Sequence, residues 1–290
     1  MFYTLSQTQQ SKPNIQRQNQ CLACHDSNSA AGIPGALLKS VVTRSDGEAM
    51  RQFGESIVDH RTPFKERWGG WYVTGSAGSG THLGNEVAVN SPKDIAGPVH
   101  FASIQMPPRT EFPNSSSDVV SLMVFEHQMH LMNLLTRFGW DLRAVEWREQ
   151  HSNPIGNASQ ALTNDVNELV DYLLFVDEAP LPKGIRGSSG FAQLFSSEGP
   201  RDSRGRSLRQ LDLRQRLMRY PCSYLIYSEA FDSLPTQGHD MIYRRMWEIL
   251  SGKERFGKHA SLSLTDRRNI VAILIATKPG IPAYFAVPSR

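Results

Sequence analysis

The sequence has little of several features that would narrow its class at once. It contains only 3 cysteines in 290 residues, so an internal disulfide becomes impossible once two of them are used elsewhere. No uninterrupted apolar run approaches about 18 residues, which excludes a membrane-spanning helix. The formal net charge is only +3 at pH 7, which argues against a protein that binds nucleic acid or other polyanions. The remaining composition, 39% hydrophobic and 20% charged, is typical of a soluble globular protein.

Two of the cysteines lie in the most specific motif of the chain, Cys21-Leu22-Ala23-Cys24-His25. Cys-x-x-Cys-His is the sequence to which a c-type haem is attached covalently. The two thiols add to the porphyrin vinyl groups, and their spacing places both sulfurs on one face of a helical turn. The histidine then binds the iron as proximal ligand. The motif therefore predicts one haem c, held by Cys21, Cys24 and His25. The sequence has no internal repeat, so we expect no further haem sites.

Two other interpretations of this motif stay open. A bare Cys-x-x-Cys is also found as a thioredoxin-like dithiol or as half of a zinc site. A redox dithiol normally follows a strand, whereas residues 16–20 are polar and not strand-like. A zinc site normally needs a second pair of ligands, and the chain has no second Cys-x-x-Cys. Both alternatives therefore rank below haem.

The motif also bears on location and on the third cysteine. Haem c is attached outside the cytoplasm, so we expect a periplasmic or otherwise extracytoplasmic protein. Residues 1–7 have neither the basic nor the apolar stretch of a signal peptide, so we expect that a signal was removed or that the reading frame starts earlier. Cys222 lies in an apolar setting and is expected to be a buried, unreactive thiol.

The hydrophobic pattern predicts a mainly α fold, with a cytochrome c-like haem segment, a short β element and an extended helical remainder. We expect a haem-attachment region at 1–115, a helical region at 116–186 and a C-terminal helical region at 187–290. The longest helix should run from Asp118 to about Arg137, with Ser117 or Asp118 as its N-cap. The other expected elements are a strand at 37–43, helices near 164–176, 208–218, 222–231, 240–250 and 264–276, and a connector at 187–206.

The second axial ligand of the iron has four candidates. His127 and His130 lie three residues apart on an apolar helix, where ionisable groups need a partner such as iron. Met106 precedes two prolines on an expected loop, and ligation by methionine would raise the reduction potential. His82 lies in a glycine-rich loop beside an aromatic cluster. We rank them His127, Met106, His130 and His82, and an ordinary structural role remains open for each.

A redox partner is the interaction that the sequence suggests. Between 201 and 219 there are seven arginines against Asp202 and Asp212. Electron-transfer proteins often meet through charge-steered contacts, so this stretch could dock an acidic partner. A solvated loop and helix face is the alternative.

Five stretches of the chain carry a resemblance to a group of proteins. They are the Cys21–His25 motif and the segments ERWGGWYVTG (66–75), FEHQ (125–128), NLLTR (133–137) and RYPCSYLIYS (219–228). With these segments the chain resembles uncharacterised bacterial single-haem c-type cytochrome proteins. The resemblance covers most of the chain and implies a haem and an extracytoplasmic location, but no activity.

Three functions follow from these observations. The leading expectation is an exported monohaem c-type cytochrome that carries single electrons, rather than an enzyme. The first alternative is a haem enzyme or small-ligand sensor with an open distal site, acting on peroxide or a nitrogen oxide. His127 or His82 would then serve as a distal acid or base. The second alternative is a haem-free binding protein, in which Cys21 and Cys24 are structural or metal-bound. No catalytic residue is assigned.

Overall fold

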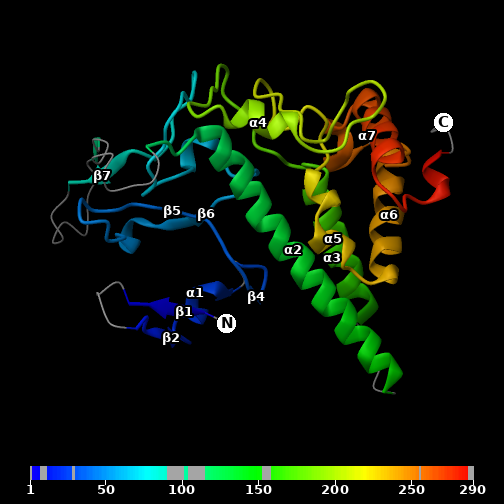
Figure 1. Ribbon diagram of the computed structural model, residues 1–290, viewed down its shortest axis with the longest axis horizontal. Coiled ribbons are helices and arrows are strands. Elements are labelled where there is room, and N and C mark those ends of the chain that lie inside the picture. Colours follow the sequence, from blue (N-terminus) through cyan, green and yellow to red (C-terminus); the bar gives the residue numbers. More distant parts are fainter. Residues whose placement is uncertain are drawn as a thin grey trace.

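The computed structural model describes residues 2–6, 12–27, 30–89, 101–103, 115–151, 158–254 and 256–286. Within these ranges the protein is mainly α with a few short strands, as predicted. Figure 1 shows the long helix α2 (Val119–Gln150) running diagonally through the molecule. The N-terminal segments with most of the strands lie on one side of α2, and the helices that follow it in sequence lie largely on the other.

The strands of the described ranges pair as antiparallel two-stranded sheets. The pairs are β1 (Tyr3–Leu5) with β2 (Ile15–Arg17), β3 (Asp26–Ser27) with β4 (Ile33–Pro34), β5 (Lys39–Val41) with β6 (Glu55–Ile57), and β7 (Glu86–Ala88) with β8 (Phe101–Ser103). The strand expected at 37–43 is the shorter β5, in which Lys39 lies opposite Ile57.

Helix α2 begins where the sequence predicts and ends later. The Asp118 side chain accepts hydrogen bonds from the backbone N–H groups of Val120 and Ser121, which confirms it as the N-cap. The helix continues past residue 137 because Phe138 and Leu142 extend its buried face and are both fully buried. An ion pair between Arg137 and Asp141, one turn apart, supports the same extension.

The other helices are shorter than α2. They are α1 (Leu22–His25), α3 (Ala158–Leu173), α4 (Phe191–Ser197), α5 (Glu229–Asp232), α6 (Thr236–Leu250) and α7 (Leu264–Thr277). Short 3₁₀ turns lie at Arg51–Phe53, Phe64–Glu66, Tyr224–Tyr227, Gly257–Ser261 and Ala283–Ala286. Helices α6 and α7 match their predictions closely, whereas α4 lies in the expected connector.

Two of the predicted helices do not form as expected, and local side-chain hydrogen bonds explain why. The helix expected at 208–218 is absent because Asp212 Oδ1 accepts the backbone N–H groups of Arg214 and Gln215, both at 2.9 Å. An aspartate that bonds its own neighbours in this way competes with a helix and favours a turn. The helix expected at 222–231 is divided at Ser228, which caps α5 by accepting from the backbone N–H of Phe231.

One hydrophobic core runs from Phe64 to Phe285 and draws on residues of all three expected regions. Its largest buried side chain is Trp68, and α2, α3 and α6 supply much of the remainder. Among the described helices, none has the length and apolar character needed to cross a membrane.

Candidate functional site

Most of the predicted haem-attachment sequence lies on α1, which packs against β3 and β4 in the N-terminal part of the molecule (Figure 1). Cys21 precedes this helix, is half-buried and carries a free thiol. His25 is the last residue of α1 and is also half-buried. The side chain of Cys24 lies outside the described part of the chain. The local backbone is therefore the single helical turn that the spacing predicts.

The imidazole of His25 is held by Gly35. His25 Nδ1 lies 3.0 Å from the Gly35 carbonyl oxygen, and the Gly35 N–H donates to the His25 carbonyl at 2.9 Å. Because a carbonyl can only accept, Nδ1 carries a proton, and in the neutral imidazole Nε2 then carries the lone pair. A histidine that binds a metal typically donates its other ring N–H in this way. The donor set therefore fits the proximal side of a c-type haem.

His127, the first-ranked distal candidate, lies instead in the centre of the core. Its Nδ1 is 2.8 Å from His60 Nδ1, and its Nε2 is 2.8 Å from the Ser223 hydroxyl. Both histidines are almost fully buried, and burial lowers the pKa of each well below its usual value. Both ring nitrogens of His127 are therefore used in a hydrogen-bonded chain of neutral groups.

Aromatic rings enclose this histidine pair. Phe175 stacks on His127 with ring centres 4.2 Å apart, and Tyr172 stacks on His60 at 4.1 Å. His60 Nε2 is buried and has no hydrogen-bond partner among the described residues, although the Val176 carbonyl is close enough to influence its pKa. These stacking contacts shield the histidine pair from solvent.

A buried ion pair lies next to the histidines. The Arg67 guanidinium donates to one carboxylate oxygen of Glu126, and the Trp68 indole N–H donates to the other at 3.1 Å. Burial raises the pKa of Glu126 above its ordinary value, and the charge of Arg67 opposes this rise. Arg67 also donates to the backbone carbonyls of Thr62 and His60, so its guanidinium joins the segment 60–62 to Glu126 of α2.

His130 lies at the edge of the same cluster. Its Nε2 is 3.1 Å from a guanidinium nitrogen of Arg61, which also donates to Asp59 at 2.6 Å. Burial lowers the pKa of His130. Because a guanidinium can only donate, His130 Nε2 is an acceptor here and the proton lies on Nδ1.

The last two distal candidates are placed less centrally. His82 is half-buried against the rings of Phe64 and Trp68, and its Nδ1 accepts the backbone N–H of Gly84 at 3.0 Å. Met106 lies outside the described residues. The structure thus brings His127 and His130 to one cluster with His60, while the described contacts of His25 are with Phe2 and Gly35. It does not bring a described candidate into contact with His25.

Sequence reasoning missed His60 as the partner of His127. The two residues are 67 positions apart, and the segment around His60 has no periodic pattern that would indicate its direction. The one available signal was the density of charged and aromatic residues between 59 and 72. Cys222, in contrast, is fully buried as expected, and burial raises the pKa of its thiol.

The arginine-rich stretch is only partly available to a partner. Arg206 pairs with Asp202, Arg209 with Glu198, and Arg216 with Asp266. Such pairs neutralise part of the positive charge that the sequence shows. The remaining positive charge of the stretch comes from Arg201, Arg204, Arg214 and Arg219.

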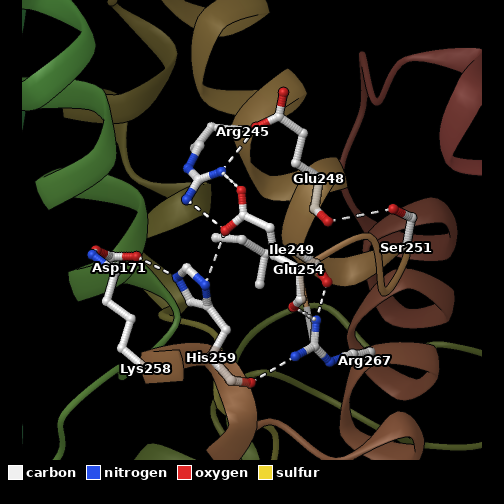
Figure 2. Close-up of polar contacts among 9 residues, drawn as sticks. All are labelled: Asp171, Arg245, Glu248, Ile249, Ser251, Glu254, Lys258, His259 and Arg267. Carbon is white, nitrogen blue, oxygen red and sulfur yellow. Dashed lines mark hydrogen bonds and ion pairs between the residues drawn. The ribbon is translucent and has the colours of Figure 1, made fainter. Parts of the chain in front are cut away.

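A second polar network links α3 to α6 and α7 (Figure 2). His259 is almost fully buried, with Nε2 2.8 Å from Asp171 and Nδ1 3.1 Å from Glu254. Arg245 binds both carboxylate oxygens of Glu254, at 2.5 and 2.9 Å. The buried guanidinium of Arg267 donates to backbone carbonyls, among them that of His259. Every charged group of this network has a partner, as expected of a structural network.

Two surface clefts, of about 350 and about 480 Å³, meet at Asp177 and Lys258 beside the end of α3. Neither is lined by His25 or by a predicted distal ligand. Within the described ranges there is also no group of three or more His, Cys, Asp or Glu residues placed to hold a metal ion.

Comparison with known protein families, with curated proteins and with solved structures returned no match for this chain.

Proposed function

We propose that this protein is an exported monohaem c-type cytochrome that transfers single electrons, with a cytochrome c-like haem segment around α1. The observation that carries the proposal is His25 at the end of Cys-x-x-Cys-His, whose Nδ1–H donates a hydrogen bond to the Gly35 carbonyl. This tautomer leaves the Nε2 lone pair for iron.

Three residues would hold the haem. Cys21 and Cys24 would form the two thioether bonds, and His25 would bind the iron as proximal ligand. When bound, the haem supplies one-electron oxidation and reduction. The protein's own contribution is to orient His25, because the backbone of Gly35 forms hydrogen bonds with both the imidazole and the backbone carbonyl of His25.

A redox partner of acidic character follows from the charge distribution. The arginines of residues 201–219 that lack a carboxylate partner in the described structure would steer such a partner by electrostatic attraction. The location proposed with the haem is periplasmic or otherwise extracytoplasmic.

The experiment is expression with export and haem c maturation, followed by optical spectroscopy and redox titration. We expect a six-coordinate, low-spin spectrum and one reversible one-electron potential. The variant Cys21→Ala/Cys24→Ala should lose the covalent haem, whereas Cys222→Ser should keep it. Haem that is retained equally in both variants would contradict the proposal.

A haem enzyme or ligand sensor with an open distal site is the second candidate. It is favoured by the hydrogen bonds at the three described candidates. His127 uses both ring nitrogens, and His130 and His82 each use a ring lone pair to accept a hydrogen bond. A high-spin iron that readily binds cyanide or carbon monoxide would support this function over electron transfer. Replacement of Met106 would then leave the spectrum unchanged, because Met106 would not be a ligand.

A further inference from the structure

We propose that Asn133 of α2 clamps the segment that holds His25 and is therefore a positioning residue for the proximal ligand. This inference rests on the proposed haem function. The clamp consists of Asn133, Gly35 and Ala36.

The first step is the bond that Asn133 makes. Its side-chain amide donates to the Ala36 carbonyl at 2.6 Å. Asn133 is buried on α2 beside the apolar residues Leu131, Leu134 and Leu135. A buried amide in such surroundings is destabilising unless it is hydrogen-bonded. The bond to Ala36 therefore ties this part of the helix to the segment that follows β4.

The second step is the close approach at Gly35. A Cβ atom added to Gly35 would lie 2.8 Å from Asn133 Cγ and closer still to Asn133 Oδ1. The backbone of Gly35 is not in the left-handed region, so its conformation alone does not require glycine. Because Gly35 has no side chain, the Asn133 amide can lie in direct contact with the Gly35 backbone.

The third step connects this contact to the imidazole. The backbone N–H of Gly35 donates to the His25 carbonyl, and the Gly35 carbonyl accepts from His25 Nδ1. Helix α2 is fixed by its Asp118 cap and by its buried face. Asn133 therefore transmits the position of a rigid helix, through the backbone of Ala36 and Gly35, to the ring that would bind iron. A bond from Nδ1–H to a carbonyl orients a metal-binding imidazole and increases its basicity.

The test compares Asn133→Leu with Thr136→Val in the haem-loaded protein. Thr136 lies on the same helix, is half-buried and bonds only to the Met132 carbonyl of its own helix in the described contacts. Loss of the clamp weakens the hydrogen bond from His25 Nδ1–H to the Gly35 carbonyl. The imidazole then donates less electron density to the iron, which raises the reduction potential of the haem. We expect a raised potential for Asn133→Leu and an unchanged one for Thr136→Val. A folded Asn133→Leu protein with the wild-type potential would overturn the proposal.

A second comparison uses the space at Gly35. Gly35→Ala should raise the potential as Asn133→Leu does, because the new methyl group displaces the Asn133 amide. In the double variant Gly35→Ala/Asn133→Ala the methyl group no longer meets that amide. The double variant should therefore match Asn133→Ala alone, which is a non-additive result. Strictly additive shifts would count against the clamp.

Failure of the clamp can be told apart from failure of the haem proposal. If the mature protein carries no haem, the clamp is tested by NMR of the His25 ring in the haem-free full-length chain. The wild-type and Thr136→Val proteins should show a slowly exchanging Nδ1 proton, and Asn133→Leu should lose it. A signal that is the same in all three proteins would overturn the clamp, whatever the outcome for haem.

Discussion

His60 Nδ1 lies 2.8 Å from His127 Nδ1 in the middle of the core, where neither ring is exposed to solvent. The Ser223 hydroxyl continues this hydrogen-bonded chain on the other side of His127. Both histidines are neutral because burial lowers their pKa values. This pairing gives His127 a structural role that can be separated from iron ligation by experiment.

Replacing His127 with leucine should destabilise the protein without changing the haem spectrum. The change leaves His60 Nδ1 and the Ser223 hydroxyl without their bonds to His127, so we expect the free energy of unfolding to fall by about 2–4 kcal/mol. Urea unfolding and the absorption spectrum measure the two effects. His151→Leu, at the exposed end of α2, is the control and should change stability by less than about 0.5 kcal/mol. A change of iron spin state in a stable His127→Leu protein would identify His127 as a ligand instead.

Acid should destabilise the protein through the same pair. Below about pH 6.5 each histidine takes up a proton in the unfolded chain, whereas burial and the charge of Arg61 keep His60 neutral in the folded state. The unfolded state then binds more protons at these two histidines, so their contribution lowers the free energy of unfolding as the pH falls. The slope is at most about 1.4 kcal/mol per pH unit for each histidine.

Urea unfolding between pH 7.5 and pH 5 measures this slope. In the variant His60→Gln one of the two histidines with a lowered pKa is gone. The unfolded state then takes up about one proton fewer relative to the folded state, so the slope should be smaller by up to about 1.4 kcal/mol per pH unit. An unchanged slope in a folded His60→Gln protein would mean that His60 does not remain neutral in the fold.

The buried pair of Arg67 and Glu126 should show strong coupling. Glu126→Leu leaves the Arg67 guanidinium buried without its counter-charge, and we expect a loss of about 3–5 kcal/mol. Arg67→Met/Glu126→Leu removes both charges and should be considerably more stable than the single variant. Thermal and urea unfolding of the two proteins provide the comparison. Equal losses in the single and double variants would argue against a dominant effect of the unpaired charge.

Arg267 should not be replaceable by lysine. Its guanidinium donates in several directions to backbone carbonyls, including those of Leu262 and His259. A lysine has one nitrogen and cannot reproduce this fork, so Arg267→Lys should lose about 2–4 kcal/mol of stability. The control is Arg268→Lys, the next residue of α7, which should have little effect. Equal stability of the two variants would contradict this role for the network in Figure 2.

The sequence predicts the elements of this fold better than their contacts. Helix α6 carries a strong periodic pattern, α2 is a long apolar stretch that follows an identifiable cap at Asp118, and α7 is an apolar stretch that ends before Pro279 and Gly280, so their positions are predictable. Residues 208–218 also contain an apolar pattern, but the bonds of Asp212 to its own backbone turn the chain there. Whether a side chain competes with a helix in this way depends on its geometry, which the hydrophobic pattern does not specify.

The candidate site shows the same division. Cys21, Cys24 and His25 are predicted as a haem site from spacing alone, because covalent attachment of haem c requires the pattern Cys-x-x-Cys-His. The contacts of His127 depend on the packing of segments far apart in sequence, which one sequence cannot specify. Three of the segments that carry the resemblance nevertheless meet in the core, where Trp68 binds Glu126 and His127 binds Ser223.

The intact mass of the exported, mature protein tests the central claim most directly. With haem c maturation in the host, we predict the polypeptide mass plus one haem, and loss of that increment in Cys21→Ala/Cys24→Ala. A polypeptide mass without the increment, with free thiols at Cys21 and Cys24, would contradict the claim and favour a haem-free binding protein.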